Sequence, residues 1–321
     1  MGKKGVFLTF IAISIVVALV LILAPSGINP ESEMMPVKAR ASKLDNYVTD
    51  LENRYLVDSL EASGTRTIIA LIGYMESQGR FVSNFEGVFE EVLLNGTVDG
   101  VLIDSYIEPD IMQGNTYPNW TGRIIAAADD AFNADTSISI NSISVYQSSP
   151  WLLTVSADLY LNVSSETAVW NKAITVKSDI DIQRFEDPSY IISTNGLYRP
   201  RINSTHVKAG QWGSNNVREH IRHATYYHYS NSRAPSFIMR FTNTSLASSC
   251  CGIEGIVNPN EISTGGMESY ADYLYFNHTY QNRCGELYNV TGLWDEFSGL
   301  QFDFEHLVNY NLTEEGVIQA C

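Results

Sequence analysis

The distribution of apolar residues separates a short N-terminal apolar run from a long, mixed remainder. The run begins at Val6 and ends at Ala24, and the hydroxyls of Thr9 and Ser14 are its only polar side-chain groups. As a helix it would measure about 28 Å, close to the roughly 30 Å hydrocarbon core of a bilayer. The pattern predicts one membrane-spanning helix, with the lipid bilayer as its partner and the rest of the chain on one side of the membrane.

A hinge and an amphipathic helix are expected after this run. Residues 25–36 contain three prolines and a glycine, which prevent a continuous helix. A narrow apolar seam then follows spacings of 4, 3, 4, 3 and 4 residues: Val37, Ala41, Leu44, Val48, Leu51 and Tyr55. We expect Ser63 and Gly64 to interrupt this helix and residues 67–75 to form a second, buried one. The seam could pack on the chain's own ectodomain or pair with a neighbouring subunit.

Three runs further along alternate apolar and polar residues with a period near two. They cover residues 138–145, 153–161 and 173–182, and this alternation is typical of strands with one buried face. We expect shorter strands at residues 101–107, 236–241 and 270–276, and helices at residues 124–132 and 216–227. The three long runs therefore predict an antiparallel sheet.

The predicted fold class is α+β: an N-terminal transmembrane helix and an amphipathic helix, then a β-rich ectodomain with an antiparallel sheet and a disulfide-bearing C-terminal part. The expected parts are a leader and transmembrane helix (1–24), a hinge (25–36), a helical segment (37–78), a β-rich ectodomain (79–200) and a C-terminal mixed α/β part with the cysteines (201–321). No linker marks the boundary near residue 200, so the last two parts can share one core.

Composition and charge fit an exported protein. The formal net charge is -16 and the pI is near 4.7, so nucleic acid and anionic membrane surfaces would repel the chain. Hydrophobic residues make up 45% of the sequence, far above the level of disordered chains. We therefore expect a folded, acidic ectodomain without a nucleic-acid partner.

Glycosylation signals point to the same compartment. The triplet N-x-[ST], without proline in the middle, occurs at Asn95, Asn119, Asn162, Asn203, Asn243, Asn277, Asn289 and Asn311. A chain rich in Ser, Thr and Asn produces some such triplets by chance, and Asn162 lies in a predicted strand. We expect a glycoprotein in which some of these acceptors, on exposed loops and edges, carry sugar.

The cysteines predict disulfides. Cys250, Cys251, Cys284 and Cys321 are an even number, confined to the last quarter of a chain that looks exported. A bond between the neighbours would close a strained ring, which favours two longer links, each from Cys250 or Cys251 to Cys284 or Cys321. A zinc site is the competing interpretation, but the sequence has no C-x-x-C pair.

Candidate chemical sites are few. His220 and His223 are three residues apart on a predicted helix, with Glu219 beside them, and could form one face of a metal site. Acidic pairs at 129–130, 179 with 181, and 303 with 305 could bind calcium, although none has the spacing of an EF-hand loop. The usual nucleophile and nucleotide-binding motifs are absent. No catalytic or cofactor-binding residue can be assigned, and a membrane-anchored extracellular hydrolase or metal-dependent enzyme using the His220 and His223 region is the alternative function.

The leader itself can be interpreted in three ways. It could be a secretory signal cut after Ser26, or an uncleaved signal anchor with Lys3 and Lys4 kept in the cytoplasm by the positive-inside rule. The sequence Lys3-Lys4-Gly5-Val6-Phe7 also resembles the class III leader of archaeal type IV pilins. That resemblance implies cleavage between Gly5 and Val6, although Phe10 stands where many pilins carry a glutamate.

Together these features predict a single-pass cell-membrane protein with a cytoplasmic N-terminus and an extracellular ectodomain. The plan is similar to that of uncharacterised archaeal cell-surface proteins with a pilin-like leader, and this implies location and architecture only. We expect a pilin-like or adhesive protein with a structural or binding role, with other surface or pilin-like subunits as candidate partners.

Overall fold

The computed structural model describes residues 41–166, 168–228, 233–244, 248, 250–262, 268–276, 285–313 and 316–319. The leader, the hinge and the predicted membrane span at residues 6–24 lie outside these ranges. None of the helices within them is long and apolar enough to cross a bilayer. The fold is α+β with antiparallel sheets, as the sequence predicts.

One long helix organises the first part of the molecule. Residues 41–50 are α-helical, Leu51–Tyr55 form a π-helical stretch (η1), and α3 (Leu56–Gln78) continues to Gly79, whose φ of 60° ends it in the left-handed region. The expected interruption at Ser63 and Gly64 is wrong. A Cβ on Gly64 would lie 2.7 Å from Cδ1 of Ile180, so the glycine lets the helix approach the sheet closely instead of ending it.

The three long predicted strands form one antiparallel sheet. Its order is β3 (Asp135–Ser149), β4 (Leu152–Ser164) and β5 (Val169–Asp181), with Val155 opposite both Val145 and Ser178. On β4, alternate residues are buried: Leu153, Val155, Ala157, Leu159, Leu161 and Val163. The intervening residues are mostly polar, as expected of a sheet with one face toward solvent.

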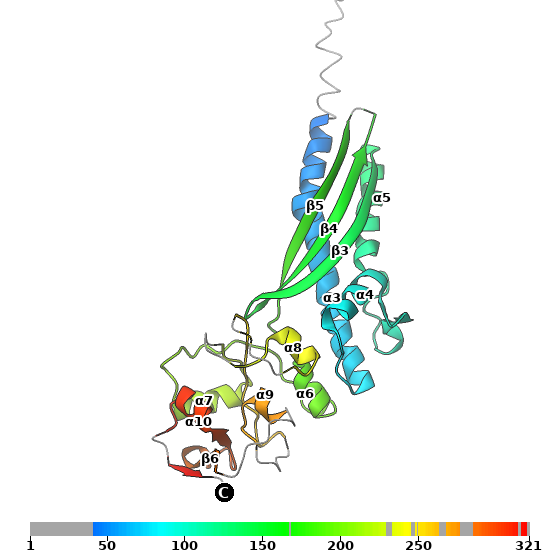
Figure 1. Ribbon diagram of the computed structural model, residues 1–321. Helices are drawn as coiled ribbons and strands as arrows, with labels where there is room; N and C mark the ends of the chain where they lie inside the picture. Colours follow the sequence, from blue (N-terminus) through cyan, green and yellow to red (C-terminus); the bar gives the residue numbers. More distant parts are fainter. Residues whose placement is uncertain are drawn as a thin grey trace, which may run out of the picture.

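Three helices cover the buried face of this sheet. The long helix packs along β5, whereas α4 (Phe85–Asn95) and α5 (Tyr117–Phe132) pack against β3. A small hairpin of β1 (Thr97–Val98) and β2 (Val101–Leu102) and the 3-10 turn η2 (Ile103–Ser105) connect α4 to α5. Figure 1 shows the helices and the sheet side by side as an elongated stalk. The strand expected at residues 101–107 is therefore only two residues long.

The seam of the long helix is used within the chain. Leu44, Val48 and Leu51 are buried, whereas Tyr55 is 41% exposed. Lys172 of β5 makes a 2.5 Å ion pair with Glu52 on the same helix. The part of the seam from Leu44 to Leu51 therefore packs within the chain's own core, whereas Val37 lies outside the described residues.

The C-terminal third gathers at the end of the stalk farthest from residue 41 (Figure 1). It contains short helices and a small sheet: α6 (Pro188–Ser193), α7 (Ser214–Arg222), α8 (Phe237–Phe241), α9 (Asp272–Tyr275), η3 (Thr291–Leu293) and α10 (Phe304–Asn309), with β6 (Leu287–Val290) between β7 (Gln301–Asp303) and β8 (Val317–Gln319). One continuous hydrophobic core joins this distal lobe to the stalk.

Two of the expected strands in this lobe are helices. Residues 236–241 contain α8, in which Phe237 and Phe241 lie one turn apart and are both fully buried. Residues 270–276 contain α9, whose first residue, Asp272, is held in a buried ion pair. Short aromatic runs have strand composition, and here tertiary contacts outweigh that local preference.

Candidate functional site

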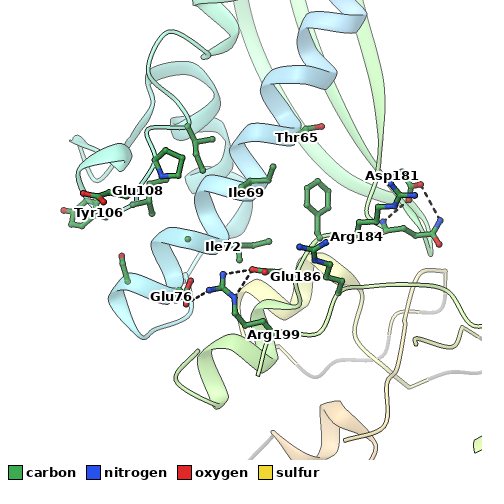
Figure 2. Close-up of a pocket in the computed structure, with 18 residues that line it drawn as sticks. Thr65, Ile69, Ile72, Glu76, Tyr106, Glu108, Asp181, Arg184, Glu186 and Arg199 are labelled. Atoms are coloured by element: carbon green, nitrogen blue, oxygen red, sulfur yellow. Dashed lines mark hydrogen bonds and ion pairs between the residues drawn. The ribbon is translucent and has the colours of Figure 1, made fainter. Parts of the chain in front are cut away.

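A cleft of about 760 Å³ lies where the stalk meets the distal lobe. One wall is the last three turns of α3, a second is the loop at residues 106–111, and the third comprises residues 181–186 and 199–201 (Figure 2). The cleft thus combines segments more than a hundred residues apart, and its volume is in the range of small-molecule sites.

The floor of the cleft is apolar. Ile69 and Ile72 lie on the side of α3 that faces the segment carrying Arg184 (Figure 2), and Phe185 also lines the cleft. Ile69 is 42% exposed, whereas the adjacent Ile68 and Ala70 are fully buried. An exposed apolar side chain inside a charged rim is a common feature of ligand sites.

The rim carries charges of both signs, and one of its arginines is fixed. Arg199 bridges Glu76 of α3 at 2.8 Å and Glu186 at 2.7 Å (Figure 2). The hydrogen bonds that Arg199 donates to Glu186 raise the pKa of Arg199, with smaller contributions from Glu76. This bridge holds the two walls of the cleft together.

The other two arginines of the rim, Arg184 and Arg201, do not form a bridge of this kind among the described residues. Arg184 and Arg201 are exposed and make no ion pair among the residues that the structure describes. Arg184 has a φ of 79°, a left-handed conformation that is uncommon for a residue with a Cβ. Among the residues that the structure describes, the Asp181 carboxylate accepts hydrogen bonds from Gln183 alone, and Glu108 is exposed on another wall. Donors and acceptors therefore remain available around the cleft.

A second charged cluster is enclosed in the core. Arg240, 2% exposed, lies 2.6 Å from Asp187 and 2.8 Å from Asp272 and stacks over Tyr226. Burial by itself would lower the pKa of Arg240, but the two carboxylates raise it; burial raises the pKa of Asp272 to about 6 despite the arginine. With its members fully buried, the cluster joins α6, α8 and α9 and offers no access to a substrate.

A third cluster surrounds His306 in the distal lobe. Its Nδ1 lies 2.6 Å from Asp303, and Glu254, which accepts a 2.6 Å hydrogen bond from Tyr310, lies on the other side of the ring. Burial would lower the pKa of His306, but these carboxylates raise it to about 10, and the histidine lowers the pKa of Asp303 to about 2. An ion pair this stable is structural, since it holds its proton throughout the physiological range.

The histidines predicted as a metal face do not act together. His220 is 2% exposed, packs against Trp212 and bonds Thr225 through Nδ1, and burial lowers its pKa to about 3. His223 is exposed and lies beside Glu219. The described residues contain no group of three His, Cys, Asp or Glu side chains that could hold a metal ion. The helical spacing is present, but the two rings lie in different environments.

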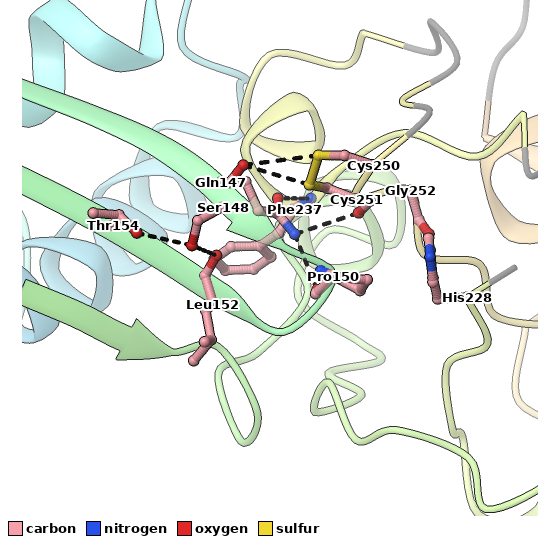
Figure 3. The surroundings of a disulfide bond; sticks show 10 residues. All are labelled: Gln147, Ser148, Pro150, Leu152, Thr154, His228, Phe237, Cys250, Cys251 and Gly252. Carbon is pink, nitrogen blue, oxygen red and sulfur yellow. Dashed lines mark hydrogen bonds between the residues drawn. A yellow bond between two sulfur atoms is a disulfide. The ribbon is translucent and has the colours of Figure 1, made fainter. Parts of the chain in front are cut away.

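The cysteines are bonded differently from the arrangement that we favoured. Cys250 and Cys251 form a disulfide with each other, in place of links to Cys284 and Cys321, which lie outside the described residues. The pair sits in a turn against the end of β3, where the side chain of Gln147 donates to the carbonyl of Cys251 and accepts from the N–H of Phe237 (Figure 3). The turn therefore accommodates a disulfide between two adjacent cysteines, a pairing that their position in the sequence disfavours.

Most of the glycosylation acceptors are accessible. Five are exposed: Asn95, Asn119, Asn203, Asn243 and Asn311. Asn162, on the outer face of β4, and Asn289 are partly buried, and Asn277 lies outside the described residues. The structure thus separates open acceptors from hindered ones.

No family model, curated protein or solved structure matches the chain, so the function has to be inferred from the sequence and the structure.

The sequence contains one signal for the cleft that the motif analysis does not use. Arg199-Pro200-Arg201 and Arg184 concentrate three arginines in a short stretch of a chain that has 20 basic and 36 acidic residues. Only the fold, however, brings them to α3.

Proposed function

We propose that this chain is a membrane-anchored, exported cell-surface protein, pilin-like or adhesive, with a structural or binding role and no catalysis. The arrangement of the stalk carries the proposal. The described chain starts at one end of a helix about 57 Å long, and the distal lobe lies at its other end. If the stalk stands upright on an anchor at residues 6–24, the cleft and the lobe lie tens of ångströms from the bilayer.

The helix and sheet also support a pilin-like plan. A long helix lies along an antiparallel sheet, and the chain begins with a leader that resembles the class III type. Because Leu44, Val48 and Leu51 are buried within the chain, this part of the seam is not free to bundle with other copies. We therefore favour a single anchored protein or a minor, tip-type component over a major filament subunit.

The positions of the groups with strongly shifted pKa values support a binding role. The strongly perturbed groups, His220, Arg240 and His306, are enclosed in the core. The open cleft instead presents arginines and carboxylates around an apolar floor, without a nucleophile beside a base. Such a site suits recognition better than reaction.

The test is the location and processing of the full chain in its native cells. We expect it to stay with membranes after alkaline extraction and to be digested by protease added outside intact cells, and an intact mass that begins at Val6 would identify a cleaved, pilin-type leader. Deleting residues 6–24 should release it from the membrane. Gly5→Val is the matched control for processing: it should leave residues 1–5 attached while the anchor persists. An intact mass that begins at Met1 would identify a signal anchor, and a chain found only in the cytoplasm would refute the proposal.

A further inference from the structure

We propose that the cleft between α3 and residues 181–186 and 199–201 binds a neutral oligosaccharide. This inference rests on the proposed function, since it requires the cleft to face the outside of the cell. It makes the protein a glycan-recognising adhesin, and the cleft its binding site.

The charges select an uncharged ligand. The chain has a formal net charge of -16, so polyanions are repelled at long range. Arg184 and Arg201, which have no ion-pair partner among the described residues, repel cations that reach the cleft itself. A segment from a second copy of this acidic chain would meet Glu76, Glu108 and Asp181 along the walls. A polar ligand without charge avoids all three penalties.

The hydrogen-bonding groups suit the hydroxyls of a sugar. Each hydroxyl both donates and accepts, whereas a guanidinium only donates and a carboxylate only accepts. Arg184 and Arg201 provide donors and Asp181 an acceptor on one wall of the cleft, and Glu108 provides a second acceptor on another. Neighbouring hydroxyls can therefore be satisfied in pairs, through charge-assisted hydrogen bonds that are stronger than neutral ones.

The floor suits the other part of a sugar ring. The C–H face of a pyranose is apolar and is best placed against apolar side chains, which Ile69, Ile72 and Phe185 supply. The cleft volume of about 760 Å³ has room for a short oligosaccharide. Amphipathic contact of this kind would cover Ile69, which is 42% exposed.

The walls are fixed before any ligand arrives. Arg199 ties Glu76 on α3 to Glu186, and the main-chain N–H of Arg184 donates to the carbonyl of Ile202 at 2.7 Å. Arg184 is held in its left-handed conformation by this local backbone pairing. A rigid site loses less entropy on binding, which is important for a ligand whose hydroxyls compete with water.

The experiment uses the full chain in lipid nanodiscs, which avoid detergents with sugar headgroups, on an array of neutral and acidic oligosaccharides. The test variant is Arg184→Ala with Arg201→Ala; alanine keeps a Cβ at residue 184, so the backbone preference is unchanged. Ile69→Trp fills the floor as a second, independent variant. Arg54→Ala, an exposed arginine of the same helix outside the cleft, is the matched control.

We expect neutral oligosaccharides to bind, and each cleft variant to weaken that binding about tenfold or more at an unchanged melting temperature. Arg54→Ala should bind as the wild type does, and raising the salt concentration should have little effect on a neutral ligand. Three outcomes would overturn the inference: no neutral ligand on the array, binding of acidic glycans that salt removes, or neutral binding that both cleft variants retain. A surface-exposed protein that binds no glycan refutes this inference alone, whereas an intracellular one refutes the proposed function.

Discussion

Replacing Leu51 by alanine tests whether the helical seam serves the chain itself. Leu51 is fully buried, and the turn that carries it is tied to β5 by the Glu52–Lys172 ion pair. Truncation of a fully buried leucine costs about 2–5 kcal/mol, because the apolar contacts are lost and a cavity remains. For a chain of 321 residues that corresponds to a fall in melting temperature of roughly 3–8 °C. Thermal unfolding followed by tryptophan fluorescence would measure it.

Tyr55 provides the control within the same seam. It continues the apolar spacing but is 41% exposed, so Tyr55→Ala should change the free energy of unfolding by less than about 1 kcal/mol. Sedimentation of both variants would report self-association. If Leu51→Ala keeps the wild-type melting temperature while Tyr55→Ala prevents self-association, the seam is an intersubunit surface and our interpretation is wrong.

Three further predictions concern the core and the disulfide. Arg240→Met should destabilise the protein by about 3–5 kcal/mol in urea titrations, since two buried carboxylates lose their partner, whereas Arg199→Met on the exposed bridge should cost less than about 1 kcal/mol; equal costs would contradict this. His220 has a pKa lowered to about 3, so the unfolded chain binds the extra proton and stability falls as the pH drops from about 6.5 toward 3. In His220→Gln the slope of stability against pH in that window should be shallower by up to about 1.4 kcal/mol per unit, and an unchanged slope would rule out a neutral buried ring. Non-reducing peptide mapping should find Cys250 and Cys251 joined within one peptide, and free thiols at both positions would contradict the structure.

Some of the fold could be predicted because its signals are local and periodic. Apolar and polar residues alternate along β4 because one face of the strand is buried, and this local pattern predicted the position of the sheet correctly. The apolar seam likewise predicted a helix whose Leu44 and Leu51 are buried. By contrast, the predicted helix interruption at Gly64 and the predicted strand at residues 236–241 were wrong, because these structures depend on residues remote in sequence. Gly64 lies against Ile180 of the sheet, and residues 237–241 form α8 inside the core.

The sequence by itself therefore determined the fold class, the antiparallel sheet and the acidic character of the chain. Only the tertiary structure decided that His220 and His223 lie in different surroundings, since helical spacing does not determine which side chain faces the core. Tertiary structure also created the cleft, because Ile69 and Arg184 meet through the packing of α3 on the sheet and of the distal lobe on both. Local patterns report periodic burial along one element, whereas a site depends on contacts between elements that are remote in sequence.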